Sequence, residues 1–158
     1  MSEDAPATDA VHRLTARGQT VAAAESLTGG LLCAAMVSVP GASVVVRGAV
    51  VAYAAAVKTS VLGVPADVVD QHGTVAAETA AAMAEAARRL LGADWGVATT
   101  GVAGPDPTEG KPVGLAYVAV SGPGTAEVAE VRTHGDREAV RAGTVAAALR
   151  LLGDALGR

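Results

Sequence analysis

Apolar and polar positions follow two periods along the chain, and these periods predict helices and strands in turn. Short apolar or β-branched runs predict strands at residues 20–24, 44–53 and 95–99. Apolar residues at helical spacing predict helices at residues 8–16, 31–39, 54–62, 65–71, 76–91 and 137–156. Two late strands, 113–120 and 126–133, flank Gly122-Pro123-Gly124, which is typical of a hairpin turn.

This order of elements predicts an α/β fold. Strands that alternate with helices favour parallel pairing, whereas the strands of a late hairpin pair antiparallel. We therefore expect a single-domain sandwich with a mixed sheet, parallel at the front and antiparallel at the hairpin edge, flanked by helices. The domain is predicted to span residues 8–156, without repeats or an interdomain linker, after a disordered N-terminus at residues 1–7.

The composition restricts how such a core is built and what the protein binds. The chain of 158 residues has no Phe, one Trp and two Tyr, so Ala, Val and Leu must fill the interior. A net charge of −4, without a basic stripe or an aromatic platform, argues against nucleic acid as a partner.

Nothing in the sequence predicts export or a membrane segment. The longest apolar stretch, 44–57, is interrupted by Arg47 and is too short to span a bilayer. The acidic start of the chain lacks the basic residues of a secretory signal. Cys33 is the only cysteine, so no disulfide can form within the chain, and this fits a reduced setting. We expect a cytoplasmic protein with no membrane partner.

The first candidate for chemistry is the turn around Ser26. It follows an apolar strand and precedes Gly29 and Gly30, which open a helix. Open α/β sheets bind ligands at the carboxyl ends of their strands, so Ser26 is expected at a ligand edge. Backbone N–H groups near Thr28 are candidates to hold a phosphate or an oxyanion, and the two glycines would allow close approach. The alternative is that Ser26 or Thr28 merely caps the helix.

A serine nucleophile needs a base, and lysine is the better candidate. None of the histidines lies in a motif-like setting; they are His12, His72 and His134. Only two of the twelve basic residues are lysines, Lys58 and Lys111. Alanine and valine surround Lys58, and burial among them would lower the pKa of its amine toward neutrality. The alternative is an exposed lysine on a helix.

Tyr53 is a further candidate because it lies five residues before Lys58, at a predicted junction of strand and helix. The two side chains would diverge on a continuous helix, but they can converge at such a junction. Tyr53 would then relay a proton or orient an amide. The alternative is a core aromatic.

A Gly/Pro-rich loop follows the third strand, again at the expected ligand edge. Its composition resembles that of a phosphate- or ribose-binding loop, with candidates Thr100, Gly101, Gly104 and Asp106. A P-loop is excluded, because prolines occupy two positions whose N–H groups the phosphate cradle requires.

Two basic residues near this edge are candidates for binding an anion. Lys111 lies at the end of the loop and is equally well explained as a solvated side chain. Arg137 opens the last helix and could hold a phosphate or carboxylate through two hydrogen bonds, while Asp136 is expected to cap that helix. No His, Asp, Glu or Cys spacing predicts a metal site.

Taken together, these segments resemble one protein family. Glu25-Ser26-Leu27-Thr28-Gly29-Gly30 is similar to its E-S-C-T-G-G motif. Further similar segments follow in order, among them Gly48-Ala49-Val50-Val51-Ala52-Tyr53, Thr100-Gly101-Val102-Ala103-Gly104-Pro105-Asp106, Lys111-Pro112-Val113-Gly114 and Gly135-Asp136-Arg137. Over residues 8–156 the chain thus resembles the CinA C-terminal domain family, also known as bacterial nicotinamide mononucleotide deamidase.

The resemblance implies an amidohydrolase that converts nicotinamide mononucleotide to nicotinic acid mononucleotide and ammonia. The family's serine nucleophile, lysine base and nearby tyrosine correspond to Ser26, Lys58 and Tyr53. The loop at 100–106, with Lys111 and Arg137, would hold the ribose phosphate. No metal or organic cofactor is implied, and relatives suggest a homo-oligomer, with a dimer favoured.

The chain departs from the family pattern beside the expected base. The family's Y-S-N-E-A-K reads Tyr53-Ala54-Ala55-Ala56-Val57-Lys58, so three polar side chains are lost while the tyrosine and lysine remain. Two alternatives to the deamidase follow. One is a pyridine-nucleotide-binding module with little or no turnover, and the other is a Ser-Lys amidase or esterase for another substrate.

Overall fold

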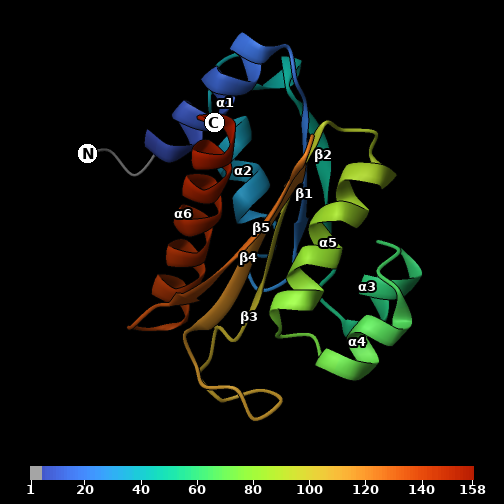
Figure 1. The fold of residues 1–158 in the computed structure, drawn as a ribbon. Coiled ribbons are helices and arrows are strands. Elements are labelled where there is room, and N and C mark those ends of the chain that lie inside the picture. Colours follow the sequence, from blue (N-terminus) through green and yellow to red (C-terminus); the bar gives the residue numbers. More distant parts are fainter. Residues whose placement is uncertain (1–4) are drawn as a thin grey trace.

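The computed structural model describes residues 5–158 and shows one mixed sheet between two layers of helices (Figure 1). The sheet has five strands in the order β2-β1-β3-β4-β5. Their bounds are β1 Val21–Glu25, β2 Val46–Val51, β3 Trp95–Gly101, β4 Leu115–Gly122 and β5 Thr125–Arg132. β1 pairs in parallel with both β2 and β3, and β4 is antiparallel to β3 and to β5. The predicted parallel front and antiparallel hairpin edge are therefore confirmed.

Helices cover both faces of this sheet. Their bounds are α1 Ala5–Arg17, α2 Leu31–Val37, α3 Ala55–Ser60, α4 Ala66–His72, α5 Ala77–Leu90 and α6 Arg137–Leu156. α1, α2 and α6 lie on one side of the sheet, and α3, α4 and α5 lie on the other (Figure 1). Within residues 5–158, no helix is both long enough and apolar enough to cross a membrane.

Small side chains let the two layers approach the sheet closely. Every residue of β1 is buried; Val21 and Ala23 join the core under α1 and α6, while Ala22 and Ala24 join the core under α5. Gly96 of β3 lies against α5 so tightly that an added Cβ would come 1.9 Å from the carbonyl oxygen of Ala84. The chain has no Phe, and small core side chains allow the backbones of the sheet and the helices to lie close together.

Most element boundaries differ from the sequence prediction by one to three residues, among them the start of β2, the end of β3 and the start of α1. A 3-10 turn at Ala42–Val44 occupies the start of the second predicted strand, so β2 begins only at Val46. β3 continues through Gly101 because Thr100 and Gly101 still pair with β4. The predicted disordered N-terminus is wrong for residues 5–7, which begin α1 and bury Ala7; residues 1–4 lie outside the described part of the chain.

The topology places the candidate residues at one edge of the sheet. β1, β2 and β3 are parallel and end together, so Ser26, Tyr53 and the loop after Gly101 all follow strand ends at that edge. α6 begins nearby with Arg137, because the preceding Asp136 caps the helix through its Oδ1, which accepts from the N–H of Ala139 at 2.9 Å. The predicted cap at Asp136 is confirmed.

The contact between Gly96 and α5 predicts that Gly96→Ala destabilises the fold by about 3 kcal/mol, because a methyl group must push the helix from the sheet. The backbone of Gly96 is not left-handed, so the effect is steric rather than conformational. Denaturant unfolding followed by circular dichroism measures it. An unchanged unfolding midpoint would show that α5 does not pack as described.

Candidate active site

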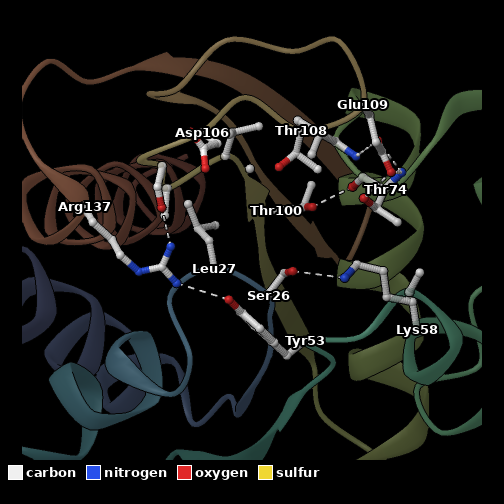
Figure 2. Close-up of a pocket in the computed structure, with 16 residues that line it drawn as sticks. Ser26, Leu27, Tyr53, Lys58, Thr74, Thr100, Asp106, Thr108, Glu109 and Arg137 are labelled. Carbon is white, nitrogen blue, oxygen red and sulfur yellow. Dashed lines mark hydrogen bonds between the residues drawn. The ribbon is translucent and has the colours of Figure 1, made fainter.

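A pocket of about 370 Å³ lies at the edge where β1, β2 and β3 end (Figure 2). Its floor holds the Ser26 hydroxyl and the Lys58 side chain, and the loop after β3 covers the opposite wall. Figure 2 shows Arg137 at one end of the pocket and Lys58 at the other, with Ser26 between them. Residues far apart in the sequence therefore meet around one serine.

Ser26 and Lys58 are in direct contact. Lys58 Nζ donates to Ser26 Oγ at 3.0 Å and to the backbone carbonyl oxygen of Ala52 at 2.7 Å. The Lys58 side chain is only 1% exposed, although it belongs to the short helix α3 on the rim of the molecule. The alternative of an exposed lysine is therefore wrong, and the structure brings the predicted serine and lysine together.

Burial sets the electrostatics of this pair. Removal of the Lys58 amine from water lowers its pKa below the usual 10.5, because the charged form loses hydration. The negative charge of Glu109 acts in the opposite direction and raises the pKa, but desolvation is the larger effect. A lysine in this setting gives up its proton more readily than an exposed lysine does.

Glu25 holds the turn that carries Ser26, a role that the sequence analysis missed. Its carboxylate is fully buried and accepts backbone hydrogen bonds from Gly30, Leu32 and Cys33 at 3.1, 2.9 and 3.0 Å. These N–H groups start α2, where a carboxylate is favoured by the helix dipole. Glu25 therefore fixes α2 to the end of β1 and keeps the turn between them in place.

This contact corrects the role expected for Gly29 and Gly30. The Gly30 N–H donates to Glu25, and the Gly29 N–H donates to the Ser26 carbonyl oxygen at 3.1 Å. Neither glycine lines the pocket, and nor does Thr28, whose hydroxyl is buried against that of Thr99 at 2.7 Å. The start of α2 therefore offers no open cradle for a phosphate.

Two N–H groups nearer to Ser26 are unpartnered within residues 5–158, and of the two residues that carry them, Leu27 and Thr28, only Leu27 lines the pocket. In the described part of the chain, no hydrogen bond uses the N–H of Leu27 or of Thr28. Arg141 of α6 donates to the carbonyl oxygens of the same two residues, at 2.9 Å for Leu27 and 3.3 Å for Thr28. A trans peptide directs its N–H away from its carbonyl, so Arg141 also fixes the direction of the Thr28 N–H.

Tyr53 lies in the pocket but does not bond to the serine or the lysine. Its hydroxyl accepts a hydrogen bond from Arg137 Nη2 at 3.1 Å, and its side chain is 62% exposed (Figure 2). The other Nη of Arg137 donates to the carbonyl oxygen of Gly104. The alternative of a core aromatic is wrong, and Tyr53 instead helps to hold Arg137 at the rim.

The Gly/Pro loop contributes most of its predicted residues to the pocket wall, namely Thr100, Gly101, Gly104 and Asp106. Lys111 does not line the pocket and lies beyond the tip of the loop. Within residues 5–158, no cluster of three His, Cys, Asp or Glu side chains could hold a metal ion.

The pocket also contains residues to which the sequence analysis assigned no role. Thr74 and Val75, just before α5, contact Glu109 at the loop tip, and all three line the pocket. Thr74 also accepts a hydrogen bond through its carbonyl oxygen from the Thr100 hydroxyl at 2.6 Å. A Glu beside Gly110 in a polar loop is typical of a solvated turn, so only the tertiary contact reveals it.

Comparison with known sequences gives one consistent family. The sequence model of the CinA C-terminal domain matches residues 3–156. A CinA-like protein of Anaeromyxobacter sp. (strain Fw109-5) is 51% identical over 143 residues, which are 90% of this chain and 35% of that protein. A CinA-like protein of Frankia casuarinae is 48% identical over 88% of this chain and 32% of its own length. The chain thus spans about a third of the curated relatives it matches.

Solved structures agree with the sequences over the whole fold. A CinA superfamily protein from Klebsiella pneumoniae matches with a TM-score of 0.94 and 33% identity, covering 99% of both chains. A competence/damage inducible protein from Agrobacterium tumefaciens matches with a TM-score of 0.91 and 34% identity, covering 100% of both. The resemblance predicted from the sequence is confirmed, and the chain belongs to the CinA family through its CinA C-terminal domain.

Proposed function

We propose that this protein is a Ser-Lys amidohydrolase that converts nicotinamide mononucleotide to nicotinic acid mononucleotide and ammonia. The observation that carries the proposal is the 3.0 Å contact between buried Lys58 Nζ and Ser26 Oγ at the floor of a pocket. Membership of the CinA family supports the substrate, because the family resemblance implies a nicotinamide mononucleotide deamidase.

The first step is attack by Ser26. In its neutral form, the Lys58 amine keeps an N–H on the Ala52 carbonyl and turns its lone pair toward the Ser26 hydroxyl. It accepts the hydroxyl proton while Ser26 Oγ forms a bond to the carboxamide carbon. The carbonyl π pair moves to oxygen, which gives a tetrahedral oxyanion and a protonated Lys58.

The N–H groups of Leu27 and Thr28 beside the nucleophile are the candidate donors to that oxyanion, and Leu27 is the one of the two residues that lines the pocket. Leu27 and Thr28 directly follow Ser26, and their N–H groups have no partner among the described hydrogen bonds. Donors fixed beforehand stabilise a developing negative charge more than mobile water does. Arg141 and Glu25 hold this turn from its two sides, so the donors do not have to be ordered during the reaction.

The remaining steps return the enzyme to its first state. Protonated Lys58 gives its proton to the carboxamide nitrogen, the carbon–nitrogen bond breaks, and ammonia leaves an ester on Ser26. Water then attacks the ester carbon while Lys58 takes a proton from it. Collapse of the second oxyanion returns that proton to Ser26 Oγ and releases the acid.

The rest of the pocket would bind the phosphate and the ribose of the mononucleotide. Arg137 lies across the pocket from Lys58 and is oriented by Tyr53 and Gly104, so a phosphate there would face a fixed guanidinium (Figure 2). Asp106 lines the same wall and is the candidate partner for the ribose hydroxyl groups. Lys111, outside the pocket lining, is not assigned to the substrate.

One observation favours a second candidate, a Ser-Lys amidase for another small amide. Ala55 lines the pocket next to Lys58, and it stands where the family pattern has asparagine. The missing side-chain amide leaves room and removes two hydrogen-bonding groups from the reacting end of the pocket. A substrate with a different group at this point would then fit better than nicotinamide mononucleotide.

Replacement of the nucleophile tests the proposed function. We expect Ser26→Ala to lower ammonia release from nicotinamide mononucleotide by at least about a thousandfold, with binding retained, because the attacking oxygen is lost. Ser38→Ala is the matched control, since that hydroxyl only bonds to Ala35 at the end of α2. Coupled detection of ammonia and calorimetric binding provide the two readouts. Turnover that survives in Ser26→Ala would exclude this mechanism.

Restoration of the family's asparagine at position 55 distinguishes the nicotinamide mononucleotide deamidase from an amidase for another small amide. If the loss of that amide limits use of the mononucleotide, Ala55→Asn raises kcat/KM for it by about tenfold, the value of one added hydrogen bond. Ala54→Ser restores the neighbouring polar residue outside the pocket lining and is the control. Equal effects of the two variants would show that position 55 does not contact the carboxamide.

A further inference from the structure

The loop that covers the pocket ends in a short hairpin whose tip is Glu109 and Gly110. Thr108 and Lys111 face each other there, with N–H to carbonyl contacts of 3.2 and 2.8 Å. The pocket wall formed by this hairpin lies over the Ser26–Lys58 pair (Figure 2). Anything that fixes the tip therefore fixes the shape of the pocket.

The backbone at the tip is unusual for a glutamate. Glu109 has a φ of 55° and is the only described residue other than glycine with a positive φ. Gly110 follows with a φ of 70°, so the tip has the two positive φ values of a type I′ turn. Asn, Asp and Gly are favoured at the first of these positions, and a longer side chain is strained there. The contacts of the Glu109 side chain must offset that strain.

The Glu109 carboxylate binds a segment more than thirty residues away. It accepts from the Thr74 N–H at 3.1 Å, from the Thr74 hydroxyl at 2.6 Å and from the Val75 N–H at 3.2 Å. Gly73 makes room for it, since a Cβ there would lie 2.7 Å from Glu109 Oε2. Burial raises the pKa of Glu109, but these hydrogen bonds and the charge of Lys111 outweigh it and keep the pKa below its usual value.

The same residue lines the pocket that holds Ser26 and Lys58. Glu109 is the charged group whose field acts on Lys58, while the other ionisable pocket residues, Tyr53, Asp106 and Arg137, gather toward the opposite end (Figure 2). Thr74 is also tied to the end of β3 through Thr100. One side chain thus joins the loop tip, the start of α5 and the surroundings of the base.

We propose that Glu109 is a positioning residue that fastens the loop at 102–114 over the Ser26–Lys58 pair and holds a negative charge opposite the lysine. This inference rests on the function proposed above for that pair. Glu109 takes no part in bond making; it acts through the Thr74–Val75 segment and through Lys58. Glycine would adopt this φ without strain, but it has no carboxylate to bind Thr74 and Val75.

The two lysines of the chain allow a direct test that does not depend on turnover. A protein isotopically labelled at lysine Cε gives one magnetic resonance signal each from Lys58 and Lys111, and a Lys111→Arg sample assigns them. In Glu109→Gln the pKa of Lys58 falls, because the amide keeps an acceptor for Thr74 but removes the negative charge that raises this pKa. Glu127→Gln, on β5 and outside the pocket lining, is the control for the same change in net charge.

A second variant tests whether Glu109 holds the loop at 102–114 in place. Glu109→Gly relieves the turn, so a purely structural role predicts an equal or more stable protein with an unchanged KM. The proposal predicts instead that KM for nicotinamide mononucleotide rises about tenfold, because the pocket wall is no longer held. An unchanged KM, together with a Lys58 titration identical in Glu109→Gln and Glu127→Gln, would overturn it. If the intact protein releases no ammonia, the proposed function fails, and the Lys58 titration alone decides this inference.

Discussion

Lys58 Nζ lies out of solvent, 3.0 Å from Ser26 Oγ and 2.7 Å from the Ala52 carbonyl oxygen, and the rest of the site is arranged around that contact. A buried amine is costly when charged unless its hydrogen-bonding groups are satisfied. In the described part of the chain, no buried side-chain nitrogen or oxygen lacks a partner. The burial that lowers the pKa of Lys58 is therefore compatible with a stable fold, because the neighbouring backbone and hydroxyl supply what water would.

The buried carboxylate of Glu25 and the small residues of the sheet place the partners of that contact. Glu25 joins the end of β1 to the start of α2, and the turn between them presents Ser26 to the pocket. The short side chains of the sheet let α5 lie close to β3, and the segment before α5 then reaches the loop tip at Glu109. The small side chains between β3 and α5 thus help to form the site as well as the core.

The order and type of the elements were predictable because their periodicity is local. Ser26 and Lys58 were identified as candidates because a strand and two glycines flank the serine and apolar residues flank the lysine. The role expected for Gly29 and Gly30 was wrong, since only the folded chain shows that Glu25 takes up the N–H groups at the start of α2. The partner of Tyr53 lies on a helix more than eighty residues away, which no local pattern reveals. Glu109 was missed for the same reason.

The proposed mechanism requires a neutral Lys58 as the base for Ser26, and the pH dependence of kcat/KM for nicotinamide mononucleotide tests this requirement most directly. Burial lowers the pKa of Lys58 from 10.5, and only the deprotonated amine can accept the serine proton. With Lys58 as the base, kcat/KM should rise with pH and reach a plateau above a midpoint lower than 10.5, and Lys58→Arg should be inactive throughout. Ammonia release that is flat across this range, or that persists in Lys58→Arg, would contradict this mechanism.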